Sequence, residues 1–192
     1  MSAGPRVATR RLFLALWPTD GERCALAAAA AAVLQANNAR AVAPQNLHLT
    51  LAFLGAVPVT RTAELLALSA ELAAAWMNGP VALTWTGLEH WKRPQILAAV
   101  TATPCAAAAE LATRLKRASG AAGFSPDLKA FRAHVTVARK VAAPVTALEL
   151  PCVLWNCASL ALVESRTDES GPVYSVLDSR LLGKREKMRR QH

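Results

Sequence analysis

Residues 47–54 read Leu-His-Leu-Thr-Leu-Ala-Phe-Leu, and residues 133–139 read Ala-His-Val-Thr-Val-Ala-Arg. The two stretches repeat one pattern: histidine, an apolar residue, threonine, an apolar residue, alanine. Their histidines, His48 and His134, lie 86 positions apart (134 minus 48) in a chain of 192 residues. Each half of the chain therefore contains one copy of the same element.

The alternation of side chains in each stretch predicts a β-strand, because successive residues of a strand point to opposite faces. The residues expected on the polar faces are His48, Thr50 and Ala52 in the first strand and His134, Thr136 and Ala138 in the second. Phe53 and the intervening leucines and valines are expected on the opposite, core-facing sides. If the two halves pack around a pseudo-twofold axis, both polar faces line one cleft.

The remaining pattern predicts an α+β fold with antiparallel sheets. Helices are expected at about 19–37, 60–76 and 104–119, the first opened by a capping box of Thr19 and Glu22. Further strands are expected at 11–17, 81–91, 95–103, 153–163 and 173–177. We expect a loose N-terminus over 1–10, a single bilobal domain over 11–182 and a basic tail over 183–192.

Composition narrows the class of protein. Hydrophobic residues make up 53% of the chain, too many for a disordered protein. The longest apolar stretch, Ala25–Leu34, is shorter than the roughly 20 residues that cross a bilayer. We read no signal peptide and expect a cytoplasmic protein with no membrane partner. The net charge of +9 favours a nucleic acid or another phosphorylated partner.

Two imidazoles across one cleft suit phosphodiester chemistry. An unperturbed histidine titrates near 6.5, so one ring can be neutral and take a proton while the other is protonated and gives one. Thr50 and Thr136 can hydrogen-bond the non-bridging phosphate oxygens, and Arg139 can add charged donors. Strict alternation points Arg139 away from His134, so Arg139 reaches the phosphate only if the strand bends near Ala138.

A metal site is the competing interpretation of the histidines. No carboxylate lies close in sequence to either motif: Glu64 comes 16 residues after His48, and Asp127 comes 7 before His134. Two histidines without further ligands make a poor zinc or iron site. The sequence also contains no nucleotide-binding glycine motif and no GxSxG motif. We therefore predict neither a metal nor another cofactor.

The paired tetrads, residues 48–51 and 134–137, resemble the HxTx motifs of the 2H phosphoesterase superfamily. The flanking segments RLFLALWP, PQNLHLTLAFLGAV, RPQILAAV, FRAHVTVARK and VESR…GPVYSVL follow the order seen in the bacterial RNA 2',3'-cyclic phosphodiesterases, also called 2'-5' RNA ligase-like proteins. The resemblance covers Arg11 to about Leu182. One departure is Ala133, where this family often has proline.

This resemblance implies a two-lobed fold with a central cleft between antiparallel sheets and helices outside. It implies metal-independent opening of a terminal RNA 2',3'-cyclic phosphate to a 2'-phosphate, with His48 as general acid and His134 as general base. Thr50, Thr136 and Arg139 would bind the phosphate. The partners would be RNA ends or cyclic-phosphate nucleotides, and we expect a monomer.

Several alternatives remain open at this level. The same site could join RNA ends through a 2'-5' linkage, or the fold could serve as a non-catalytic RNA-end or nucleotide-binding module. Phe13 and Trp91 are candidates to stack on the terminal base, although Phe13 equally fits a core position. Arg93 and Lys140 could meet upstream phosphates or could be ordinary surface charge.

Overall fold

The computed structural model describes residues 7–142, 144–145, 148–168 and 171–183. Its helical elements are α1 (Asp20–Ala36), α2 (Thr62–Ala75), α3 (Ala106–Ala121) and the 3-10 turns η1 (Pro44–Asn46) and η2 (Val59–Arg61). Its strands are β1 (Thr9–Leu16), β2 (Arg40–Ala41), β3 (Leu49–Pro58), β4 (Val81–Trp91), β5 (Ile96–Thr101), β6 (His134–Arg139), β7 (Glu149–Cys157), β8 (Ser159–Asp168) and β9 (Gly171–Leu181). The predicted α+β class is confirmed.

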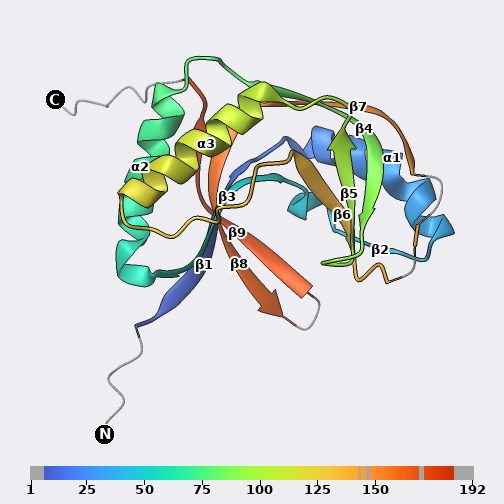
Figure 1. The fold of residues 1–192 in the computed structure, drawn as a ribbon, viewed down its shortest axis with the longest axis horizontal. Helices are drawn as coiled ribbons and strands as arrows, with labels where there is room; N and C mark the ends of the chain where they lie inside the picture. The colour runs from blue at the N-terminus through green and yellow to red at the C-terminus, as the bar shows by residue number, and fades with distance from the viewer. Residues whose placement is uncertain (1–6, 143, 146–147, 169–170, 184–192) are drawn as a thin grey trace, which may run out of the picture.

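The strands form two antiparallel sheets, one for each lobe. The four-stranded sheet has the order β3-β1-β8-β9, and the five-stranded sheet has the order β2-β6-β5-β4-β7. Helices α2 and α3 lie together on the first sheet, and α1 packs against the second (Figure 1). Each sheet combines strands from early and late in the chain, so neither lobe corresponds to one half of the sequence.

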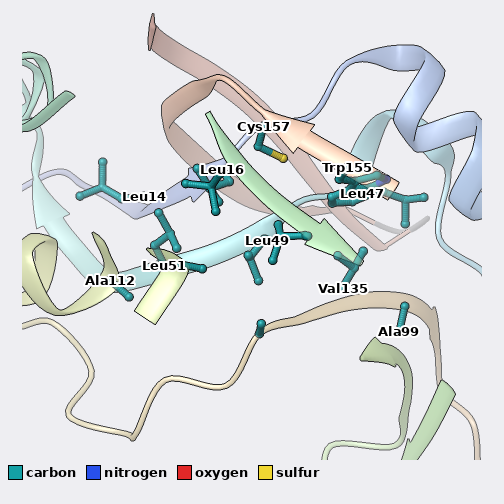
Figure 2. Close-up of a cluster of buried hydrophobic side chains, with 14 of the residues drawn as sticks. Leu14, Leu16, Leu47, Leu49, Leu51, Ala99, Ala112, Val135, Trp155 and Cys157 are labelled. Atoms are coloured by element: carbon teal, nitrogen blue, oxygen red, sulfur yellow. The ribbon is translucent and has the colours of Figure 1, made fainter. Parts of the chain in front are cut away.

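The two strands with the repeated pattern meet at the junction of the lobes, where β3 contacts β6. Leucines of β1 and β3 gather with Val135 of β6 in one buried cluster (Figure 2). Leu49, Leu51 and Val135 are 0%, 2% and 0% exposed. Their burial holds each strand by its apolar side and leaves the histidine side free to line a cavity.

Helix α1 begins as the sequence predicts. The Thr19 side chain accepts from the backbone of Glu22, and the Glu22 carboxylate accepts from the Thr19 N–H at 2.7 Å. These bonds satisfy amide groups that would otherwise lack partners at the first turn. At the other end, the helix stops after Ala36, close to its predicted limit.

The single strand predicted over 153–163 is wrong. The extended segment is interrupted at Ala158, so that β7 ends at Cys157 and β8 begins at Ser159. The two strands belong to different sheets. In β7 buried and exposed residues alternate, whereas 160–163 are all buried. The two strands read as one largely apolar stretch of sequence. The point at which the chain passes from one lobe to the other is marked only by the change from alternating to continuous burial.

The ends of the chain differ in part from expectation. Strand β1 starts at Thr9, inside the segment that we expected to be loose. The basic residues of the expected tail, 184–190, lie outside the described residues. Within the described part of the chain, no helix combines the length and the apolar character needed to cross a bilayer.

Candidate active site

A β-bulge follows the threonine of the first repeated strand. The pairing of β3 with β1 passes from Thr50 to Ala52 and leaves Leu51 as an extra residue. The bulge turns Ala52 into the core, where it is 0% exposed, and brings Phe53 to the cavity that contains His48. The predicted faces of Ala52 and Phe53 are therefore wrong, because the bulge interrupts strict alternation.

The second repeated strand carries a bulge at the equivalent position. The pairing of β6 with β5 passes from Thr136 to Ala138 and leaves Val137 extra. Both Val137 and Ala138 are buried, so the predicted polar face of Ala138 is also wrong. The same bulge restores Arg139 to the side of His134, and both residues line one cavity. This supplies the bend near Ala138 that Arg139 needs.

His48 lies immediately before β3, at the end of the turn formed by η1. Its Nδ1 donates to the carbonyl oxygen of Asn46 at 2.7 Å, since a carbonyl can only accept. In the neutral ring, Nε2 is then the bare nitrogen, and it lies 3.1 Å from the hydroxyl of Thr50. Phe13, Trp17 and Tyr174 surround the imidazole, with ring centroids 4.8, 5.6 and 5.0 Å away.

His134 repeats this arrangement on the other lobe. Its Nδ1 donates to the carbonyl oxygen of Arg132 at 2.8 Å, again two residues earlier in the chain. The ring packs on Trp91, with centroids 4.6 Å apart. The indole of Trp91 donates to Glu89 at 2.9 Å, and Glu89 also pairs with Arg132. Both imidazoles are thus held by Nδ1, which leaves Nε2 as the nitrogen for proton exchange; in His48 this nitrogen accepts from the Thr50 hydroxyl.

Burial depresses the basicity of both histidines. It lowers the pKa of His48 from 6.5 to about 4, against the opposing hydrogen bond to Asn46 and together with the charges of Arg139 and His134. Burial also lowers the pKa of His134, and the Arg132 charge acts in the same direction. Near neutrality the protein without substrate therefore has both imidazoles in the neutral form.

Arg139 links the two lobes at the cavity. Its Nη2 donates to the hydroxyl of Tyr174 at 3.1 Å, so a residue of β6 is joined to a residue of β9. The Nε of Arg139 is buried and makes no hydrogen bond with the described residues. A buried donor without a protein partner is costly, so this guanidinium is suited to an anion that supplies the acceptor.

These side chains surround a cavity of about 370 Å³. The structure brings all the predicted site residues to its wall: Phe13, His48, Thr50, His134, Thr136 and Arg139. Polar wall residues that sequence reasoning missed include Tyr174, Lys129 and Ser165. Tyr174 and Ser165 occur only within the segment VESR…GPVYSVL, and Lys129 belongs to no motif, so the sequence did not show their positions at the cavity.

One supporting residue also escaped the sequence reasoning. Arg23 of α1 is 6% exposed, and its Nε donates to the carbonyl oxygen of Leu47 at 3.2 Å. Its guanidinium lies 4.6 Å from the centre of the Trp17 ring. Arg23 thereby ties α1 to the backbone beside His48. Arg23 belongs to neither repeated motif, so the sequence gave no indication that it supports His48.

His90 lies outside the cavity. His90 bonds through Nε2 to the carbonyl oxygen of Val141 at 2.9 Å and does not line the cavity. Among the described residues, no cluster of three or more His, Cys, Asp or Glu side chains has the arrangement of a metal site. The two repeated motifs and Arg139 place two imidazoles, two hydroxyls and a guanidinium on the wall of this cavity, an arrangement that can transfer protons beside an anion.

Residues 22–169 match the family described as the 2'-5' RNA ligase superfamily. The chain belongs to this superfamily. It is 31% identical over 184 residues to an RNA 2',3'-cyclic phosphodiesterase of Thermus thermophilus, with 88% of each chain covered. The superfamily and this relative support a phosphoesterase.

Solved structures of the superfamily's fold resemble this protein over most of its length. A structure described as a phosphoesterase has a TM-score of 0.80 at 25% identity, covering 92% of this chain and 100% of that one. Escherichia coli LigT in complex with phosphate has a TM-score of 0.71 at 26% identity, covering 92% and 99%. The two-lobed 2H phosphoesterase fold expected from the sequence is therefore confirmed.

Proposed function

We propose that this protein hydrolyses the 2',3'-cyclic phosphate at the 3' end of RNA and leaves a 2'-phosphate. The observation that carries the proposal is the matched placement of His48 and His134 on one cavity, each with Nδ1 bonded to a backbone carbonyl two residues earlier in the chain. The Thermus thermophilus relative named for this activity supports the same reaction.

In the proposed reaction a water molecule attacks phosphorus and the bond from phosphorus to O3' breaks. His134 accepts the proton of the attacking water at Nε2. His48, as imidazolium, gives its Nε2 proton to O3', and exchange with solvent then restores both rings. Because the free protein holds the pKa of His48 at about 4, the general acid depends on the substrate. The bound phosphate anion raises that pKa by favouring the charged ring.

The non-bridging oxygens of the phosphate are assigned to Thr50, Thr136 and Arg139. The two hydroxyls come from opposite lobes, and Arg139 offers the buried Nε that lacks a partner among the described residues. Donors placed before the reaction stabilise charge that develops on the phosphate without reorganising during the step. The phosphate complex of Escherichia coli LigT supports an anion in this fold.

The stacking of the terminal base is assigned to Trp91 and not to Phe13. Phe13 is 3% exposed, and its ring is stacked on His48, which leaves little surface for a nucleobase. Trp91 is partly exposed at the cavity and is fixed by Glu89 and Arg132. Base stacking on an aromatic ring is tolerant of sequence. The proposed reaction therefore selects the cyclic phosphate more strongly than the base.

The test is incubation of an RNA ending in 2',3'-cyclic phosphate with the protein in EDTA, with His48→Gln and His134→Gln as controls. Mass spectrometry and enzymatic mapping of the product distinguish a 2'-phosphate from a 3'-phosphate. We expect a 2'-phosphate, formed in the chelator and lost in both variants. Formation of a 3'-phosphate, or a reaction restored only by added zinc or manganese, would refute the proposed mechanism.

The same incubation separates the other two functions. With an RNA carrying a 5'-hydroxyl added, a longer product with a 2'-5' linkage would assign the reverse reaction to this site. Tight binding of the cyclic phosphate end with no conversion would assign a binding module.

A further inference from the structure

A second cavity of about 410 Å³ adjoins the candidate active site. Its wall is formed by β2, the turn η1, the end of β6 and the start of β9. The two cavities share four wall residues: Val42, Asn46, Arg139 and Tyr174. A ligand that extends beyond the first cavity in this direction therefore enters the second one directly.

The wall of the second cavity combines positive charge with apolar surface. Its described residues include the cations Arg40, Arg139 and Lys140 and no carboxylate. Val42 and Val173 add apolar surface, and Val173 is 40% exposed. Cations beside apolar surface suit a nucleotide, because its phosphate needs charged donors while its base gains from leaving water.

We propose that the second cavity binds the nucleotide on the 5' side of the reacting one, so that an RNA strand is a better substrate than a cyclic mononucleotide. This inference rests on the proposed function. At a 3' end closed by a cyclic phosphate, the chain continues only through O5' of the terminal nucleotide. With the cyclic phosphate between the histidines and the terminal base on Trp91, which lines the first cavity and not the second, the second cavity is left for the upstream residue of the strand.

Substitution of Lys140 tests the second cavity without altering the first. It follows β6 directly, its side chain is exposed, and it lines the second cavity without lining the first. Its charge is therefore available to an upstream phosphate and remote from the proton-transfer groups. Arg139 and Tyr174 line both cavities, so their substitution would disturb the reaction itself.

The experiment compares kcat/KM for adenosine 2',3'-cyclic phosphate and for the dinucleotide ApA ending in the same cyclic phosphate. We expect the wild-type protein to prefer the dinucleotide. In Lys140→Gln the preference should fall by about fivefold, the upper end of what one exposed ion pair contributes. Lys140→Glu should lower it further. For a longer single strand, each lost phosphate contact should reduce the salt dependence of log kcat/KM by about 0.7.

Arg117→Gln provides the matched control, because Arg117 is an exposed cation on α3 outside both cavities. This variant should keep the wild-type preference. Equal kcat/KM for the two substrates in the wild type, or an unchanged preference in both Lys140 variants, would overturn the inference and leave the proposed function standing. If the protein opens neither substrate, the proposed function is wrong and the inference falls with it.

Discussion

The phenyl ring of Phe13 lies stacked on the imidazole of His48, with centroids 4.8 Å apart and planes inclined by 26°. Trp17 stacks on the same imidazole at 5.6 Å, and the ring of Tyr174 meets it edge-on at 5.0 Å. These rings limit the tilt of His48 and exclude water from its sides. The aromatic rings therefore add to the Asn46 hydrogen bond in fixing the direction of Nε2, and they contribute to the burial that lowers the pKa of the ring.

Replacement of Phe13 by leucine should lower kcat more than it raises KM. Leucine fills most of the space but gives the imidazole no flat support, and small misplacements of a reacting group can cost up to about a hundredfold in rate. We expect a loss in kcat of about tenfold or more, measured by steady-state kinetics with thermal unfolding as a check on folding. Trp91→Leu is the comparison and should mainly raise KM. If both variants raised KM equally, Phe13 would contact the terminal base of the substrate instead of supporting His48.

Removal of either imidazole should cost about 10²–10⁴ in rate, the usual contribution of a general acid or base. His48→Ala and His134→Ala should both show this loss, and the double variant should lose less than the product of the two, because the pair acts as a unit. Binding of a 2'-phosphate product should largely survive, since Thr50, Thr136 and Arg139 remain. Normal turnover in both folded variants would make the repeated motifs structural.

The sequence predicted which residues line this cavity better than it predicted how the strands present them. The repeat identified both histidines and both threonines of the cavity wall, and the residue pattern predicted α1, α2 and α3. Strict alternation failed at Leu51 and Val137, because a bulge is set by the pairing of two strands and not by the local pattern. Tyr174 reaches Arg139 only through the meeting of β9 and β6, a long-range contact that no local pattern encodes.

The pH dependence should differ between kcat/KM and kcat. The parameter kcat/KM reports the free protein, in which His48 must carry a proton although its pKa is about 4. Above pH 6.5, kcat/KM should therefore fall by about tenfold per pH unit. The basic limb of kcat should lie at higher pH, because bound phosphate favours protonated His48. Rate measurements from pH 4 to 9 test this, and a kcat/KM that rises through pH 9 would point to hydroxide or metal-bound water.

The free energy of unfolding should decrease as the pH is lowered, and His48 should account for part of that decrease. Its folded pKa of about 4 lies below the ordinary 6.5, so between these values the unfolded chain binds more protons than the folded one. This part of the free energy of unfolding is present above pH 6.5 and is lost as pH falls toward 4. Urea titrations at pH 7.5 and pH 5 should show a smaller pH effect in His48→Gln than in wild type. His90→Gln is the control and should keep the wild-type difference.

Replacement of Tyr174 by phenylalanine should weaken phosphate binding without disturbing the aromatic shell. Phenylalanine keeps the ring against His48 and Phe13 but removes the hydroxyl that accepts from Arg139 at 3.1 Å. Because a partly buried hydrogen bond to a charged group contributes about 1–2 kcal/mol, the inhibition constant of inorganic phosphate should rise by about fivefold or more. The pH at which kcat declines should not move, since the walls around His48 are retained. Arg139→Ala should raise the same inhibition constant further. If it does so while Tyr174→Phe leaves the constant unchanged, Arg139 is held in place without Tyr174, and the link between β6 and β9 plays no part in binding phosphate.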